Sequence, residues 1–270
     1  MDGTKIFRGG LGHIFGVIVL AFVLIPILAL VFVSLSSANF LSFPWDEGWG
    51  VQSYKQIPQQ SRFITGAVNS LQLAAYTAVI SVCIGLLGAV AQVRHRFPGR
   101  RLLILLGSSS LFVPQVMLGL ALLVTLSALG VPVATIGLRM GHIAIALPFA
   151  LRILAASLTG INPDQELAAQ NLGASKLRAF WSVTLPQIRT GVAAAFIMCF
   201  IISFDNVAVS LFLAGPGFSV LPVALYNYAA NVFDGVAAAV SVSMVAIAMT
   251  VIVAIERTVG LDKLFGGDAQ

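Results

Sequence analysis

The stretch ELAAQNLGASKLRAFWSVTLP, residues 166–186, is a polar interruption in a chain that is otherwise strongly apolar. It carries Glu166 and Lys176 on either side of Gly173 and ends at Pro186. Of the 270 residues, 59% are hydrophobic and only 9% are charged, whereas soluble proteins average about 25% charged residues. The apolar sequence on both sides of this stretch therefore predicts an integral membrane protein.

Six apolar stretches are long enough to cross a bilayer as helices, which takes about 20 residues each. They are residues 11–35, 67–93, 102–129, 140–158, 192–214 and 236–255. The first stretch also has features of a secretory signal peptide, but its apolar run exceeds the roughly 7 to 15 residues of a signal core and favours a span. The fold class predicted is all-α: a polytopic membrane protein of six helices in a single domain, residues 1–270, with a core at about 65–258.

The distribution of Lys and Arg predicts the orientation of these spans, because cytoplasmic loops carry an excess of basic residues. With the N-terminus inside, three basic residues fall outside: Lys55, Arg62 and Arg139. The other twelve fall on the cytoplasmic side: Lys5, Arg8, Arg94, Arg96, Arg100, Arg101, Arg152, Lys176, Arg178, Arg189, Arg257 and Lys263. We therefore expect both termini and the polar stretch in the cytoplasm. The formal charge of +5 is then a consequence of topology and does not indicate nucleic-acid binding.

Residues 160–188, called the 160–188 segment below, contain the signals of two short helices. Asn162 suits an N-cap, Pro163 the first helical position, and Gln165 a capping box. Gly173 is placed to end this helix in a left-handed turn. A second helix is expected to begin near Ser175 and to stop at Pro186. Such helices form either a capped surface connector or a docking surface, and the length of the loop favours docking.

The same residues resemble the cytoplasmic loop of ABC importer permeases. Ala168, Ala169 and Gly173, followed by VTLP at 183–186, match that family's pattern E-A-A-x-x-x-G, nine residues, then I-x-L-P. Leu167 occupies the family's Glu position, and the acid stands one residue earlier at Glu166. A shift of one position along a helix turns the side chain by about 100° about the helix axis. Glu166 is therefore expected to point in a different direction from the family's Glu. The resemblance implies a type I importer fold in which this loop is a coupling helix that fits a separate ATPase subunit. The coupling residues it implies are Glu166, Ala168, Ala169, Gly173, Ala174, Leu185 and Pro186.

Asp205 is the acidic residue that falls inside a predicted span. A carboxylate at the bilayer centre costs about 2.5 to 3.5 kcal/mol on insertion scales, so such residues face a cavity or a partner. The partner alternatives are Arg152 or an amide. Gln115, next to the kink expected at Pro114, joins Asp205 and Asn206 as candidate pathway residues. A kink is also expected at Pro148.

The stretch SFDNVAVSLFLAGPGFSVLP, from Ser203, is similar to the fifth span and following loop of permeases in spermidine/putrescine importers. Those permeases commonly carry two acids in tandem, whereas Asn206 follows Asp205 here. The resemblance implies one half of a translocation pathway for a polyamine-like solute, with Asp234 near the binding protein. It also implies four partners in a bacterial inner membrane: a second permease, two ATPases and an extracytoplasmic solute-binding protein. We expect the second permease to be a different chain, with an identical one as the alternative. Other small solutes, such as an amino-acid derivative, an opine or an organophosphonate, remain alternatives.

Other classes of function have weaker support in the sequence. No phosphate-binding G-x-x-x-x-G-K-[ST] motif occurs, so ATP and Mg²⁺ are expected on the partner ATPases and no cofactor on this chain. The histidines and cysteines lack metal-ligand spacing, and we expect no metal site. An intramembrane protease needs either a serine motif with a histidine or a second membrane aspartate, and neither is evident in this sequence. An ion-coupled carrier or channel explains Asp205 but leaves the spacing of the 160–188 segment unexplained. We therefore expect a transport subunit and not an enzyme.

Overall fold

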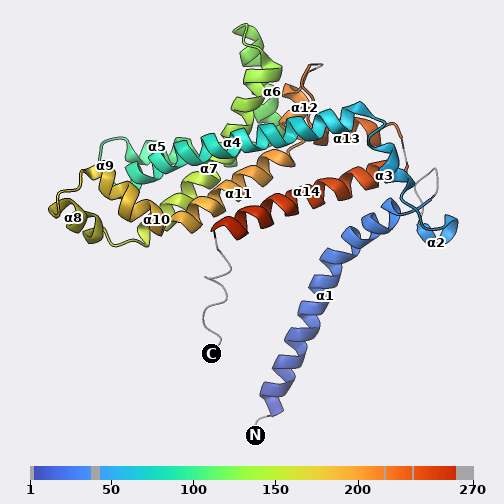
Figure 1. Cartoon of the computed structure of the whole chain (residues 1–270), viewed down its shortest axis with the longest axis horizontal. Coiled ribbons are helices and arrows are strands. Elements are labelled where there is room, and N and C mark those ends of the chain that lie inside the picture. Colours follow the sequence, from blue (N-terminus) through green and yellow to red (C-terminus); the bar gives the residue numbers. More distant parts are fainter. Residues whose placement is uncertain (1–2, 38–42, 216, 233, 260–270) are drawn as a thin grey trace. The chain divides into compact units, whose positions relative to one another are not determined.

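The computed structural model describes residues 3–37, 43–215, 217–232 and 234–259, and Figure 1 shows the whole chain. Lys263, which entered the orientation prediction, lies outside the described residues. Within them the chain is helical, and its only extended pairings are the isolated bridges Ser36 with Trp49 and Gly215 with Phe218. The all-α fold class is confirmed.

The chain forms two compact units. Unit 1 comprises residues 1–63 and 227–246, and unit 2 comprises residues 64–226 and 247–270. Helices α4 (Ser61–Arg94), α13 (Leu221–Ala229) and α14 (Gly235–Val259) have residues in both units. The prediction of one transmembrane domain over residues 1–270 stays a prediction.

Unit 1 holds the long helix α1 (Gly3–Ser34) and the short helices α2 (Pro44–Glu47) and α3 (Gln52–Gln56). The aromatic side chains of this region pack edge to face, with the Phe32 ring centroid 6.0 Å from that of Trp45 and 5.9 Å from that of Trp49. The Ser34 and Tyr54 hydroxyl oxygens lie 2.8 Å apart. Both tryptophans remain exposed, as is common for aromatic residues at a membrane interface.

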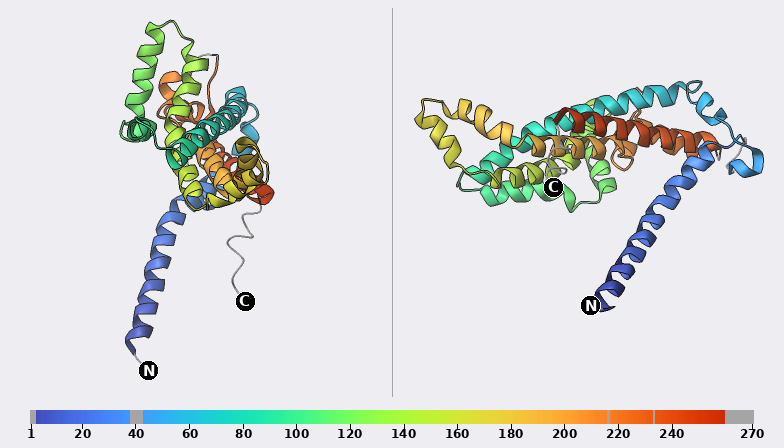
Figure 2. Two further views of the ribbon diagram at one scale, coloured as in Figure 1. Left: turned by 90° about the vertical axis from the view of Figure 1, so that its left-hand side faces the viewer. Right: turned by 60° about the horizontal axis from the view of Figure 1, so that its bottom comes forward.

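The remaining helices lie in unit 2. They are α5 (Arg100–Ser108), η1 (Ser109–Leu111), α6 (Gln115–Ala128), η2 (Val133–Gly137), α7 (Leu138–Thr159), α8 (Asp164–Asn171), α9 (Lys176–Ala179), η3 (Phe180–Thr184), α10 (Leu185–Gln187), α11 (Arg189–Phe204) and α12 (Ser210–Leu213). Figures 1 and 2 show the yellow 160–188 segment at one end of this unit.

Helices α7 and α11 pack along one another and form the centre of unit 2. Small residues permit this close approach: a Cβ added at Gly191 of α11 would lie 2.7 Å from the Cβ of Ser157 in α7. Ala146 of α7 and Ala195 of α11 are fully buried. Small residues at contacts are the usual means by which membrane helices associate, because lipid supplies no hydrophobic drive between them.

Within the part of the chain that the structure describes, four helices are long and apolar enough to cross a membrane, and up to six spans result when each of two bent pairs counts as one. The third predicted span, residues 102–129, is broken: α5 with η1 meets α6 at an angle of 103°. The break includes Pro114, whose ring is incompatible with a continuing helix. The kink expected there is therefore a sharp bend, whereas α7 continues through Pro148.

The fifth predicted span, residues 192–214, is also interrupted. Helix α11 begins earlier, at Arg189, and the segment before it meets it at 73°. Helix α11 then ends at Phe204 and α12 begins at Ser210. The sequence predicted that Asp205 and Asn206 lie inside a membrane helix. In the structure they lie instead in the break between α11 and α12.

Candidate functional site

The first helix of the 160–188 segment begins at Asp164, one residue later than predicted. Pro163 precedes it, and the Asn162 side chain caps it from one position further back, because its Oδ1 accepts the Asp164 backbone N–H at 2.9 Å. Gln165 contributes a backbone N–H bond to the Asn162 carbonyl, 3.4 Å, in place of the expected capping box. Asn162 therefore satisfies a free helix amide, although it is not the residue next to the helix.

Helix α8 ends at Asn171, and Gly173 forms the left-handed turn predicted after it, with a φ of +94°. The Ala174 N–H reaches back to the Ala169 carbonyl, 3.1 Å, and the Gly173 N–H to the Gln170 carbonyl, 2.9 Å. These bonds satisfy carbonyls that a helix end leaves free. The Ser175 hydroxyl then accepts the Arg178 N–H at 3.3 Å and starts α9. The glycine thus fixes the reversal between the two short helices.

Pro186 does not stop the second helix, which corrects the sequence-based expectation. Helix α9 passes into a π-turn at Phe180–Thr184 and then into α10, which contains Pro186 and ends at Gln187. Proline lacks the N–H that would bond a carbonyl of the preceding turn, and the wider turn just before it accommodates this loss. The Gln187 side-chain amide also donates to the Val183 carbonyl at 2.8 Å. The change of direction comes two residues after Pro186, at Ile188.

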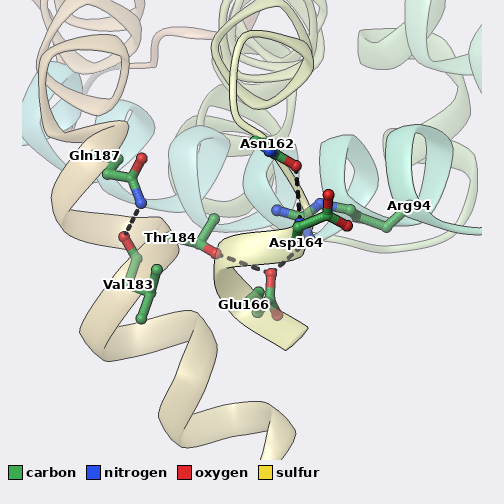
Figure 3. A network of polar contacts seen from close by, with 7 residues as sticks. All are labelled: Arg94, Asn162, Asp164, Glu166, Val183, Thr184 and Gln187. Atoms are coloured by element: carbon green, nitrogen blue, oxygen red, sulfur yellow. Dashed lines mark hydrogen bonds and ion pairs between the residues drawn. The ribbon is translucent and has the colours of Figure 1, made fainter. Parts of the chain in front are cut away.

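Glu166 is held within its own chain, as Figure 3 shows. Its Oε2 lies 2.5 Å from Nη1 of Arg94, at the end of α4, and accepts the Thr184 hydroxyl at 2.9 Å. The side chains of Arg94 and Glu166 are only 20% and 15% exposed. The sequence did not indicate this pair, because Arg94 stood out only as one of several basic residues near a turn. Glu166 therefore ties the 160–188 segment to the end of α4.

Leu167, in the position where the resembling family has Glu, is 54% exposed. Ala168 and Gly173 are exposed, and Ala169, Ala174 and Leu185 are half-buried. Pro186 is exposed as well. Leu172 is 90% exposed. The exposed surface from Leu167 to Gly173 thus includes two leucines, an alanine and a glycine beside Asn171, and it carries no acidic side chain at the family position. Beside it lies a hollow of about 580 Å³ lined by residues of α4, α8 and α9 with Arg94 and Glu166 in its wall.

The break after α11 forms a second polar region. Asp205 is exposed, and its backbone N–H bonds to the Ile201 carbonyl at 3.1 Å. Among the described residues Arg94 with Glu166 is the only ion pair, so the expected alternative of an Asp205 pair with Arg152 is wrong. A carboxylate at a helix C-terminus adds to the negative end of the helix dipole. The potential at Asp205 therefore favours a cation.

Gln115 and Asn206 meet, although 91 positions separate them in the sequence. The Asn206 side-chain amide donates to Gln115 Oε1 at 2.7 Å, and its Oδ1 accepts the Val209 N–H at 2.8 Å. Gln115 is the first residue of α6, after the 103° bend. Two of the three predicted pathway residues are thus joined where two broken spans approach each other, with Asp205 next to them in sequence.

His142 lies fully buried in α7, and both of its ring nitrogens contact hydroxyls. Nδ1 is 2.7 Å from Ser203 Oγ, and Nε2 is 2.9 Å from Ser210 Oγ. These serines stand on either side of the break that contains Asp205. Sequence analysis missed this role, because nothing in the local sequence around His142 indicates its partners. Among the described residues no group of three His, Cys, Asp or Glu side chains could hold a metal ion.

Asp234, the predicted binding-protein contact, lies in unit 1. Its Oδ2 accepts the Tyr228 hydroxyl at 2.5 Å and its Oδ1 accepts the Val236 N–H at 3.0 Å. The Arg62 guanidinium lies 4.8 Å from the centroid of the Tyr228 ring. Burial, and then the hydrogen bond to Asp234, raise the pKa of Tyr228. Both carboxylate oxygens of Asp234 are used within the chain, and its contact with a binding protein stays a prediction.

Three features together define a membrane permease: the bent spans, the two exposed short helices of the 160–188 segment, and the polar break. The chain belongs to the family described as binding-protein-dependent transport system inner membrane component, whose model matches residues 81–259. It is thus the permease component of an ABC importer, a multi-pass membrane protein and a transport subunit.

Individual relatives agree with this assignment. The spermidine/putrescine transport system permease protein PotC of Escherichia coli K12 is 31% identical over 227 residues, which cover 83% of this chain and 82% of that protein. The putrescine transport system permease protein PotI of the same strain is 26% identical over 213 residues, 76% of this chain and 75% of its own. A bacterial ABC transporter involved in alginate import has the same fold, with a TM-score of 0.69 at 17% identity over 95% of this chain and 98% of its own.

Proposed function

We propose that this permease imports an organic cation of the polyamine class. The similarity to the spermidine/putrescine permease of Escherichia coli supports this proposal. The observation that carries it in this chain is Asp205, an exposed carboxylate without an ion-pair partner in the described residues, at the C-terminal end of a broken membrane helix. Ends of broken helices near the membrane centre are where transporters commonly bind charged substrates.

The polar break provides the groups that an alkylammonium needs. An ammonium group donates hydrogen bonds and carries a positive charge, and Asp205 supplies the charged acceptor. Asn206 and Gln115 are already bonded to each other, so they position the break beside Asp205 and leave Asp205 as the principal ligand. One acid in place of two suits a single ammonium group at this point of the pathway.

The chain forms half of the pathway and works with four partners: a second and different permease, two ATPase subunits and an extracytoplasmic solute-binding protein that delivers the substrate. ATP and Mg²⁺ bind to the ATPases. Both termini and the 160–188 segment lie in the cytoplasm of a bacterium, in agreement with the excess of Lys and Arg on that side. Asp234 lies on the opposite side, where the binding protein docks.

Helix α8 and the turn at Gly173 form the coupling surface. Their outer face is exposed and apolar at Leu167 and Leu172, and an ATPase groove would cover it. Because Glu166 is paired with Arg94, docking relies on shape and apolar contact, and movement of α8 is transmitted through this ion pair to the end of α4.

The test is uptake by the complete transporter in proteoliposomes, with its binding protein and radiolabelled spermidine. Asp205→Asn should lower uptake about tenfold or more, because it removes one charge and leaves the shape of the side chain. The affinity of the binding protein for spermidine should stay unchanged. Unchanged uptake in Asp205→Asn excludes its role as the cation ligand. A binding protein that prefers sugars or oxyanions removes the polyamine assignment and leaves the importer class intact.

A further inference from the structure

An apolar hollow of about 520 Å³ lies between the end of α4, helix α5 and the middle of α7. The residues that line it are all Ile, Leu or Gly, among them Ile84 and Gly88 of α4, Leu103 and Leu106 of α5, and Leu151 of α7. Leu106 is 64% exposed. One end of the hollow reaches Gly99, in the turn that joins α4 and α5. This hollow is separate from the 160–188 segment and from the polar break.

The turn at this end is strongly basic and lacks compensating acids. Arg94, Arg96, Arg100 and Arg101 fall within eight residues, and residues 48–163 contain no Asp or Glu. Arg94 is paired with Glu166, which is the only ion pair among the described residues. The other three arginines are exposed. Three positive charges therefore stand beside an apolar hollow without a carboxylate to neutralise them.

The start of α5 adds to this positive potential. Arg100 and Arg101 form its first turn, which contains no acid, whereas a helix N-terminus favours negative charge. Arg100 and Arg101 directly follow Gly99, which one end of the hollow reaches, and long helical side chains tend to lean toward the N-terminus of their helix. An anion at this place would relieve an electrostatic arrangement that is otherwise unfavourable.

We propose that this hollow holds an acyl chain of an anionic phospholipid, whose phosphate is bound by Arg100 and Arg101. An apolar groove next to a basic cluster fits a molecule with a hydrocarbon chain and a negative headgroup, and basic pockets between membrane helices on the cytoplasmic side bind such headgroups. The inference rests on the orientation given under the proposed function, which puts this turn in the cytoplasmic leaflet. It does not depend on the transported solute.

The first experiment measures phosphatidylglycerol and phosphatidylcholine binding to the purified full chain by native mass spectrometry. We expect one phosphatidylglycerol to bind saturably, and Arg100→Gln with Arg101→Gln to weaken its binding about tenfold or more. Lys176→Gln with Arg178→Gln removes two exposed charges from α9 and should leave binding unchanged. Equal binding of both lipids to the unmodified chain overturns the proposal, whether or not the variants fold.

The second experiment tests the hollow. Ile84→Trp should fill it and release the lipid, whereas Val79→Trp enlarges an exposed residue of the same helix outside the hollow and should not. A photoreactive benzoylphenylalanine in place of Leu106 should cross-link to phospholipid in membranes. A cross-link to a protein chain instead shows that a second permease or another subunit occupies the hollow and overturns the proposal.

The two proposals fail separately. If the unmodified chain shows no selective binding of phosphatidylglycerol while the transporter takes up spermidine, only the lipid site is removed. Intact lipid binding in a transporter that does not carry spermidine removes the substrate assignment alone.

Discussion

Nη1 of Arg94 lies 2.5 Å from Oε2 of Glu166, and the two residues are 72 positions apart in the sequence. This ion pair joins the end of a membrane helix to the first helix of the 160–188 segment. It gives Glu166 a partner within the chain, so under the proposed function the apolar residues and the glycine would be the ones left to contact an ATPase. The Arg94 Nη2 atom is buried without a hydrogen-bond partner, so the pair is the main compensation for the guanidinium charge.

Glu166→Gln should loosen α8. The substitution keeps an oxygen for the Thr184 hydroxyl but removes the charge opposite Arg94, and hydrogen bonds to charged groups contribute about 1.5 to 3 kcal/mol. Hydrogen exchange followed by mass spectrometry should show faster exchange of the α8 amides. Asp164→Asn, an exposed acid on the same helix, is the matched control and should have a smaller effect. Identical exchange in the two variants would show that the ion pair does not hold α8.

Gly173→Ala should reduce the transport obtained per ATP hydrolysed. A Cβ at this position meets no atom within 4 Å, so the cost comes from the backbone: the left-handed conformation costs a non-glycine residue about 1 to 2 kcal/mol. Gly173→Asn should be milder, because Asn tolerates this conformation better. The control is Gly160→Ala in the same segment, where φ is −77°. Uptake and ATPase activity measured together in proteoliposomes decide the matter, and normal coupling in Gly173→Ala contradicts the prediction.

His142→Leu should destabilise the protein by leaving the Ser203 and Ser210 hydroxyls buried without partners. Each orphaned hydroxyl costs about 1 to 3 kcal/mol. Adding Ser203→Ala and Ser210→Ala to His142→Leu should recover much of the loss, because no unpaired polar group then remains. Thermal unfolding in detergent measures both, and Ser109→Ala, at an exposed hydroxyl, should change little. A triple variant less stable than His142→Leu alone would argue against this account.

Asn206→Asp should separate the two hydrogen bonds of the Asn206 side chain, one to Gln115 and one to the Val209 N–H. The carboxylate still accepts the Val209 N–H, but it has no hydrogen to donate to Gln115 Oε1. A double-mutant cycle with Gln115→Leu should therefore give an interaction energy of about 0.6 kcal/mol, the average for side-chain hydrogen bonds between membrane helices. Thermal unfolding of the four proteins supplies the cycle. Additive effects would mean that the 2.7 Å contact contributes no coupling.

Sequence alone determined the class of protein, because this information is local or compositional. Six long apolar stretches require a membrane, and a bilayer admits such stretches as helices. The turn at Gly173 was predictable for the same reason, since left-handed backbone favours glycine within a few residues of a helix end. Asp205 was recognisable because a carboxylate in an apolar run is costly wherever the rest of the chain lies.

Only the tertiary structure decided which residues meet. Glu166 faces Arg94, Gln115 faces Asn206, and His142 joins Ser203 to Ser210, in each case across more than 60 positions of sequence. These contacts depend on where two spans bend, and a proline permits a bend without fixing its angle or place. Pro114 accompanies a bend of 103°, Pro148 lies in a continuous helix, and Pro186 precedes a change of direction by two residues. The packing of neighbouring helices chooses among these outcomes, and that packing is a property of the folded chain.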